Sequence, residues 1–325
     1  MDDVPSTLSQ ARIAQSLVKA AIAKHNDRYE NVFLKAVAAG AMLSFGGLLS
    51  EVLSAGASGL TQSNPGIVKV LGGFVFPVGL VMIVLQGFEL LTSNMMTFPM
   101  AVIKKEIPWW SLPLNWVIVL FGNLVGSLFT AAILVHCSAI VSTEPYISYI
   151  QTFALHKAAD PHWHQIFLRG IGCNWLVSVA IWQATGARET ISKVEFLNVY
   201  VKVIDDVVQI FAIWIPIWIF VACGFDHVVA NMFSVPLGIM FGADVRGPRI
   251  LPIMLLTSCN ISKLTVAAYI RKSLIAAFLG NVVGALIVAL PATYFYLLDY
   301  DAGGLRAAEN GTPMYDRASD ERKTS

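Results

Sequence analysis

Charged residues are scarce in this sequence. Asp, Glu, Lys and Arg make up 13% of the 325 residues, whereas apolar residues make up 56%. Soluble domains carry about 25% charged residues, so the composition excludes the pair of soluble domains that the length alone would suggest. Several runs of about 20 residues between Val32 and Leu298 are nearly free of charge, which is long enough to cross a bilayer as helix. The chain is therefore predicted to be an all-α integral membrane protein.

Groups of residues that carry covalent or metal chemistry are also missing. The four cysteines are far apart and mostly lie in apolar runs, so they predict neither a disulfide nor a zinc site. Asp226 and His227 are adjacent, and on a helix they would point about 100° apart. No third group completes a catalytic or metal-binding set with them. We expect neither an enzyme nor a cofactor, and the net charge of +1 argues against a nucleic-acid partner.

The N-terminal segment, residues 1–31, has no continuous apolar core and therefore does not predict a cleavable signal peptide. It predicts an amphipathic helix instead, because Ile13, Leu17 and Ala21 repeat at a spacing of four residues. Two interpretations of this helix remain open. It lies on the membrane surface, or it packs against the underside of a helix bundle.

A central motif contains an acid and a histidine inside apolar sequence. Residues 224–236 read GFDHVVANMFSVP, and residues 87–99 read GFELLTSNMMTFP. A second matched pair follows in the same order, GNLVG at 122–126 and GNVVG at 280–284. The repetition predicts two homologous halves. Interrupted apolar segments in corresponding halves indicate a transport site where the halves meet, and a histidine at membrane depth is costly unless it has a partner or a function.

The apolar runs predict six membrane-spanning helices, of which the second and fifth are broken. Their expected ranges are 32–53, 67 to a break after the Gly87 motif, 112–136, 166–184, 207–225 with a continuation near Val235, and 274–298. Three helices per half would turn the second half upside down and bring Thr92 near His227 in mid-membrane. Residues 137–164 are expected to form a polar loop. Glu51 has two interpretations, a charge at the membrane interface or a pore residue.

An even number of spans places both termini on one side of the membrane. The distribution of Lys and Arg favours the cytoplasm as that side. We therefore predict a multi-pass plasma-membrane protein with a cytoplasmic amphipathic segment (1–31), a membrane domain (32–298) and a disordered cytoplasmic tail (299–325).

Five motifs resemble the formate/nitrite transporter family across Val32 to Leu298. They are GFELLTS, NWVIVLFGNLVG, LRGIGCNWLVSVAIW, GFDHVVANMF and GNVVGALIV. The resemblance implies an aquaporin-like protomer of six helices in two inverted three-helix repeats. It also implies a homopentamer in the bilayer with one pore in each protomer.

The same resemblance implies roles for ten residues of this chain. His227 would be the central polar residue and Thr92 its partner, with Asn174 and Asn281 also in the pore. Apolar constrictions would flank this pair: Phe76 and Phe220 on the outer side, and Leu80, Leu90 and Leu91 on the inner side. Lys157 would be the basic residue of a vestibule.

We expect the transport of small monovalent anions, coupled to proton transfer through His227. The N-terminal extension and charged tail resemble fungal members of the family, which favours nitrite. Formate or another short monocarboxylate is the alternative. A neutral-solute channel of the aquaporin type is a more distant one, because Asn94 and Asn231 are each followed by methionine rather than by Pro-Ala.

Overall fold

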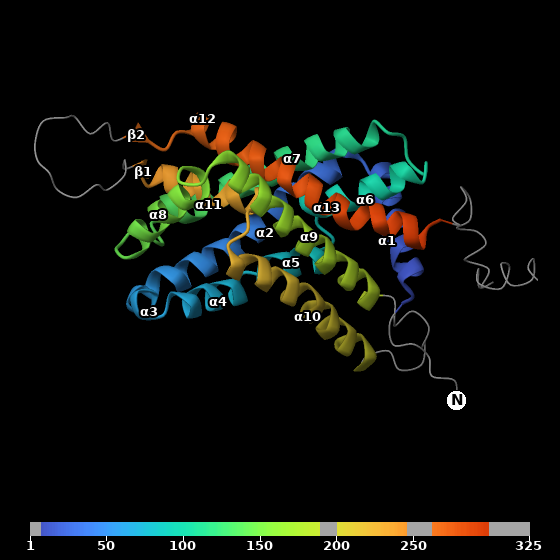
Figure 1. Cartoon of the computed structure of the whole chain (residues 1–325), viewed down its shortest axis with the longest axis horizontal. Helices are drawn as coiled ribbons and strands as arrows, with labels where there is room; N and C mark the ends of the chain where they lie inside the picture. Colours follow the sequence, from blue (N-terminus) through green and yellow to red (C-terminus); the bar gives the residue numbers. More distant parts are fainter. Residues whose placement is uncertain (1–7, 189–199, 246–261, 299–325) are drawn as a thin grey trace, which may run out of the picture.

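The structure is a computed structural model that describes residues 8–188, 200–245 and 262–298. The predicted tail at 299–325 lies outside the described residues. Within them the fold is helical, apart from β1 (Asp244–Val245) and β2 (Ser262–Lys263), which pair antiparallel with Asp244 opposite Lys263. The bundle is elongated in Figure 1, with α1 towards one end and α3 and α8 towards the other. We refer to these as the α1 end and the α8 end.

The helices follow one another in two series. The first series is α1 (Gln10–Asn26), α2 (Tyr29–Gly56), α3 (Ser58–Ser63), α4 (Pro65–Val75), α5 (Val78–Gln86), α6 (Leu91–Ile103), α7 (Ser111–Phe129) and the π-helix η1 (Thr130–Cys137). The second series is α8 (Tyr146–Ala158), α9 (Trp163–Arg188), α10 (Tyr200–Cys223), α11 (Val228–Met240), α12 (Val266–Ala268), the π-helix η2 (Tyr269–Leu274) and α13 (Ile275–Tyr296).

The described residues contain several candidate membrane-spanning helices. Five helices are long and apolar enough to cross a membrane, and a sixth span results if α10 and α11, which are bent by 47° at a short break, are counted together. The predicted all-helical membrane protein is therefore confirmed at this level.

Both predicted breaks are present, and they have the same backbone design. Gly87 and Gly224 end the preceding helices with φ of +67° and +79°, a left-handed conformation that glycine adopts without steric cost. Leu90 and His227 then take extended conformations immediately before α6 and α11. The expected continuation of the fifth helix near Val235 was wrong, because α11 already begins at Val228. His227 caps that helix with its own side chain, so no further irregular residues are needed.

The segment 137–164 was predicted to be a polar loop, and this was also wrong, because it contains the helix α8. Its average composition is polar, but Ile150, Ala154 and Ala158 recur every four residues and are buried. α8 packs closely on α11: a Cβ added at Gly238 would lie 2.2 Å from the Cβ of Ala154.

Two helix pairs, α2 with α7 and α9 with α13, approach at backbone contact. A Cβ added at Gly126 would lie 1.9 Å from the carbonyl oxygen of Val37, and one added at Gly284 would lie 2.3 Å from that of Ile171. Small residues allow this approach in membranes. The paired GNLVG and GNVVG motifs therefore mark equivalent helix contacts.

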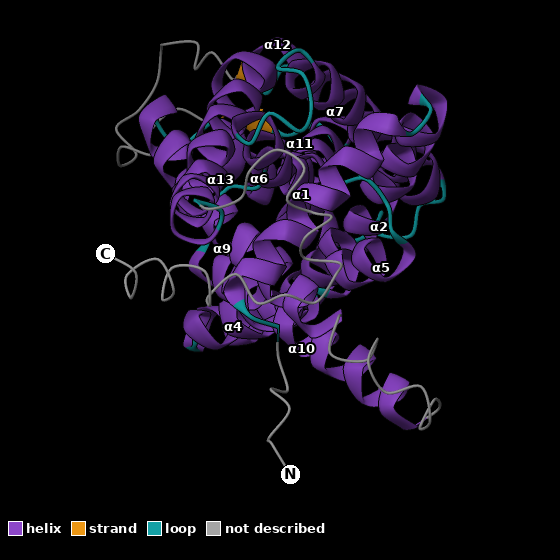
Figure 2. Cartoon of the chain, turned by 90° about the vertical axis from the view of Figure 1, so that its right-hand side faces the viewer, coloured by secondary structure: helices purple, strands orange, loops and turns teal. Residues whose placement is uncertain are grey.

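Helix α1 packs against the bundle. Ile13, Leu17 and Ala21 are buried, and α1 contacts α6, α9 and α13. Figure 2 looks onto this end of the molecule and shows α1 near its middle. Of the two interpretations of the N-terminal helix, the structure therefore has the packed one.

Candidate functional site

The two breaks meet at the pair Thr92 and His227. The distance from Thr92 Oγ1 to His227 Nε2 is 3.0 Å. Thr92 lies in the first turn of α6, and His227 lies directly before α11. Both side chains are buried, with exposures of 0% and 3%. The structure thus brings together the two residues that the repeated motif predicted to be neighbours.

Hydrogen bonds identify the proton positions on the His227 ring. Nδ1 accepts the backbone N–H of Ala230 at 3.1 Å, so that nitrogen carries a lone pair. In the neutral ring the proton is then on Nε2, which donates to the hydroxyl oxygen of Thr92. A second proton on the ring would remove the cap of α11. The site therefore presents an imidazole N–H and a threonine hydroxyl, two groups that can donate hydrogen bonds to an anion.

Aromatic rings pack beside this pair. Phe76, the residue directly after α4, and Phe220 of α10 meet edge to face, with ring centroids 5.8 Å apart. Phe220 in turn stacks on His227 at 5.8 Å. The two phenylalanines predicted to form the outer constriction are therefore in contact with each other and, through Phe220, with the central histidine.

The leucines predicted for the inner constriction are buried as well. Leu80 is in α5, Leu90 is in the first break and Leu91 begins α6, with exposures of 2%, 1% and 0%. Leu90 and Leu91 directly precede Thr92 in the chain.

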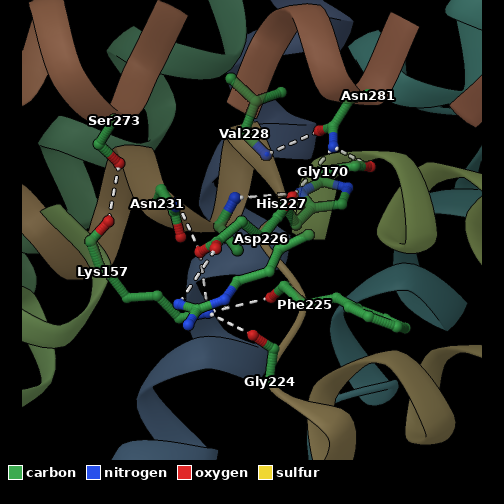
Figure 3. Close-up of polar contacts among 12 residues, drawn as sticks. Lys157, Gly170, Gly224, Phe225, Asp226, His227, Val228, Asn231, Ser273 and Asn281 are labelled. Atoms are coloured by element: carbon green, nitrogen blue, oxygen red, sulfur yellow. Dashed lines mark hydrogen bonds and ion pairs between the residues drawn. The ribbon is translucent and has the colours of Figure 1, made fainter. Parts of the chain in front are cut away.

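Asn281 holds the second break in place. Its Oδ1 accepts the N–H of Val228 at 2.9 Å, and its Nδ2 donates to the carbonyls of Gly170 and Asp226, each at 2.9 Å (Figure 3). Asn123 makes the equivalent contacts at the first break, with Leu91 N–H and with the carbonyls of Ala36 and Glu89. These bonds satisfy backbone groups that the interrupted helices leave unpaired.

Asn174 connects the start of α6 with Asn281, the residue that holds the second break. Its Nδ2 donates to the carbonyl of Thr92 at 3.2 Å and to that of Asn281 at 2.8 Å. Asn174 is fully buried. This residue therefore fixes the backbone that carries Thr92, and its own Oδ1 has no hydrogen-bond partner in the described ranges.

Lys157 of α8 binds the second break from the α8 end. Its Nζ lies 3.0 Å from Asp226 Oδ1 and 3.0 Å from the carbonyl oxygen of Phe225 (Figure 3). Asn231 donates to the same carboxylate oxygen at 3.3 Å. Asp226 is fully buried, and the Lys157 side chain is 13% exposed. We call Lys157, Asp226 and Asn231 the Lys157 cluster. Its cation contacts Asp226, the residue directly before His227 in the chain.

A matching cluster on the first break was missed by sequence reasoning. Lys24 of α1 lies 3.1 Å from Glu89 Oε2 and 2.7 Å from Asn94 Oδ1, and Asn94 donates to Glu89 at 2.8 Å. No role for Lys24 was predicted, because its partners Glu89 and Asn94 lie far along the chain. The repeated motif did contain a signal for this contact. Glu89 occupies the position in the first motif that Asp226 occupies in the second, and a buried carboxylate at either position needs a cation as its partner.

The α1 end also has a small open pocket. Its polar lining comes from Lys24, His25, Ser111 and Asn115. No group of three or more possible metal ligands occurs within the described residues.

Comparison with known proteins agrees with this geometry. A family model described as "Formate/nitrite transporter" matches residues 11–296. A "Probable formate transporter" of Methanothermobacter thermautotrophicus is 35% identical over 80% of this chain and 86% of its own. The "Formate channel FocA" of Escherichia coli strain K12 is 29% identical over 90% and 96%. A solved structure titled "Pentameric formate channel with formate bound" superposes with a TM-score of 0.62 at 25% identity, covering 83% of this chain and 97% of the other.

Proposed function

Because the chain belongs to the formate/nitrite transporter family, we propose that it carries small monovalent anions across a membrane along a path past Thr92 and His227. As a member of this family it is a membrane transporter and not an enzyme. The contact between Thr92 Oγ1 and His227 Nε2 at 3.0 Å is the observation that carries the proposal. It sets two hydrogen-bond donors where the two broken helices meet.

Formate is the substrate that the comparisons favour. Several relatives are named formate transporters or channels, and one is named a formate-nitrite transporter. Nitrite, which the fungal-like extension and tail favoured, stays a prediction and is the second candidate. Both are small monovalent anions that can accept hydrogen bonds from an imidazole N–H and a hydroxyl.

The mechanism follows from the charges. Moving an ion into a medium of low dielectric costs on the order of 20 kcal/mol in the idealised limit, so a bare anion does not pass the contact between Phe76 and Phe220. Lys157 and Lys24 attract the anion from opposite ends of the path. A proton that accompanies the anion removes most of the desolvation cost. His227 then holds the substrate through Nε2–H while its Nδ1 stays engaged with Ala230.

The proposal extends to the architecture. Equivalent contacts at the two breaks support two inverted three-helix repeats of aquaporin type, formed by residues 32–298. The pentameric title of the solved relative supports a homopentamer with one path in each protomer. Residues 1–31 and 299–325 are then cytoplasmic, in a protein of the plasma membrane.

Uptake by proteoliposomes tests this function. Purified protein is reconstituted, and uptake of isotope-labelled formate, nitrite, lactate and hydrosulfide is measured in parallel between pH 5 and pH 8. We expect formate uptake in the wild type and lower uptake at every pH in His227→Phe, since the ring's N–H, which would hold the substrate, is gone. Unchanged uptake in a His227→Phe protein of unchanged oligomeric size would refute the role of His227. Liposome swelling in glycerol without anion uptake would instead support a neutral-solute channel.

A further inference from the structure

Glu51 is a buried acid to which the transport path described above gives no role. Its side chain lies in α2 with 4% exposure, and neither carboxylate oxygen has a hydrogen-bond partner among the described residues. The interpretation of Glu51 as a charge at the membrane interface was therefore wrong, because the folded bundle covers it. An acid in such a place needs another explanation.

The face of α2 that carries Glu51 is turned towards the constriction. One helical turn earlier, a Cβ added at Gly47 would lie 3.2 Å from the Phe233 ring and 3.9 Å from the Phe76 ring. Glu51 follows on the same face, closer to the α8 end. It therefore lies one helical turn from the contact with Phe233 and Phe76, on the side of the α8 end.

Two hydroxyl groups, from Ser234 and Tyr149, lie near the carboxyl. Ser234 of α11, 5% exposed, is close enough to interact with Glu51. The Tyr149 phenol of α8 interacts with both Ser54 and Glu51. Each of these hydroxyls can accept a proton from a carboxylic acid or donate one to a carboxylate. They link Glu51 to Tyr149, whose ring is only partly buried.

Other titratable groups on the neighbouring elements are not placed to neutralise Glu51. In η1, His136 packs on Phe241, with ring centroids 4.9 Å apart. In α4, Lys69 is exposed. Within the described ranges no lysine, arginine or histidine makes an ion pair with Glu51. A buried carboxylate without such a partner costs several kcal/mol, whereas the protonated acid carries no charge.

The same face of α8 leads from Glu51 to the Lys157 cluster. Tyr149 stacks on Phe153 at 5.9 Å, and Lys157 Nζ lies 5.8 Å from the centre of the Phe153 ring. On α11, Ser234 follows Asn231 by three residues and thus lies on a neighbouring part of its surface. A change of charge at Glu51 therefore occurs at the same end of the bundle as the Lys157 cluster.

We propose that Glu51 is a proton-binding site that couples anion entry at the α8 end to pH, an inference that rests on the proposed function. When Glu51 is protonated, Lys157 and Arg169 face only the Asp226 carboxylate and keep a net positive charge, and the anion enters. Above its titration midpoint the O–H bond of the acid breaks, the proton leaves through the hydroxyls of Tyr149 and Ser54 to solvent, and the remaining carboxylate repels the anion. No other bond forms or breaks.

The first test is functional and uses full-length protein in proteoliposomes. Glu51→Gln keeps the shape of the neutral acid but cannot ionise. The ratio of formate uptake in Glu51→Gln to uptake in the wild type should be near one at low pH. Above the midpoint it should rise by up to about tenfold per pH unit, because the protonated fraction of Glu51 falls at that rate. Glu30→Gln on the same helix, where the side chain is 71% exposed, is the matched control and should give a flat ratio.

The second test does not depend on transport. Infrared difference spectra recorded across a pH titration should contain the C=O stretching band of a protonated carboxyl group that is present in the wild type and absent in Glu51→Gln. Tyr149→Phe should retain this band but slow its exchange with solvent.

The outcomes separate the two proposals. A missing infrared band would overturn the coupling role of Glu51. A band that is present together with a Glu51→Gln to wild-type uptake ratio that does not change with pH would also overturn it, since that is the result expected of a purely structural acid. Wild-type liposomes that take up no anion at any pH would refute the proposed function instead. If Glu51→Gln does not fold, Glu51→Asp keeps an ionisable group, and its infrared band and pH profile should both shift in the same direction.

Discussion

At the scale of single residues, the Lys157 and Asp226 pair shows how a charge is held inside an apolar bundle. Asp226 is fully buried, and apart from Lys157 the described cation nearest to it is Arg169, at 4.0 Å. Both charges pay a cost for leaving water, and their mutual attraction in the apolar interior offsets that cost. The pair therefore behaves as a unit.

Removing only Lys157 should be strongly destabilising. Lys157→Met leaves the buried Asp226 carboxylate with Arg169, at 4.0 Å, as its cation, and breaking a buried pair by removing one partner costs about 3–5 kcal/mol. Thermal unfolding in detergent, followed by tryptophan fluorescence, should show a large drop in the apparent Tm. Lys69→Met, on the exposed face of α4, is the control and should leave Tm unchanged. Lys157→Met combined with Asp226→Asn should recover part of the loss; an additive loss would contradict the pairing.

A second prediction at this scale concerns acid. Asp27 joins α1 to α2, and its hydrogen bond from Lys35 at 2.7 Å, followed by that from Asn31, lowers the pKa of Asp27 from 3.8 to about 2. Because the folded-state pKa is depressed, this stabilisation is present above pH 3.8 and is lost as the pH falls through about 2.

Hydrogen exchange measures that effect directly. Amides of α1 should lose protection between pH 4 and pH 2 in the wild type, whereas Asp27→Asn should show weaker protection at pH 6 and little further change. Protection that stays constant to pH 2 in the wild type would show that Asp27 does not secure α1.

At the scale of helices and their breaks, close packing limits which side chains fit between neighbouring helices. Gly284→Ala places a methyl group 2.3 Å from the carbonyl oxygen of Ile171, so α9 and α13 must move apart. Such overpacking costs about 1–3 kcal/mol, and the apparent Tm should fall accordingly. Gly66→Ala in α4 is the matched control: nothing lies within 4 Å of its added Cβ, and alanine favours helix. Equal Tm values for the two variants would contradict the close contact.

Much of this level was predictable from the sequence, and the failures have physical causes. The breaks could be located because Gly87 and Gly224 recur in matched motifs and glycine adopts positive φ. The restart of α11 at Val228 was missed because it depends on a side-chain cap by His227, which composition does not reveal. Helix α8 was missed because its buried face occupies only every fourth position in a polar stretch.

The site was predictable where it is local and not where it is long-range. Thr92 and His227 could be paired through the repeat. The partnership of Lys24 with Glu89, and the burial of Glu51, depend on contacts between helices that no local pattern in the sequence records. Those contacts decide which charges are neutralised.

At the scale of the whole molecule, the proposed assembly predicts a mass. Many large apolar side chains of the described helices are exposed in the single chain, among them Phe121 and Phe211 at 55% and 62%, and lipid or neighbouring protomers must cover them. Native mass spectrometry from a mild detergent should give five copies of the 35.3 kDa chain. A stable monomer under conditions that preserve anion uptake would contradict the pentamer.

The matched asparagines have a consequence for how such a molecule could arise. Asn123 supports the break in its own half, and Asn281 does the same in the other, so neither half borrows these bonds from its counterpart. An ancestral gene of half this length, whose product inserted into the bilayer in both directions, could therefore have built the same passage from two identical copies. Fusion of the duplicated genes would then have freed each copy to diverge, leaving a histidine in one half where the other has leucine.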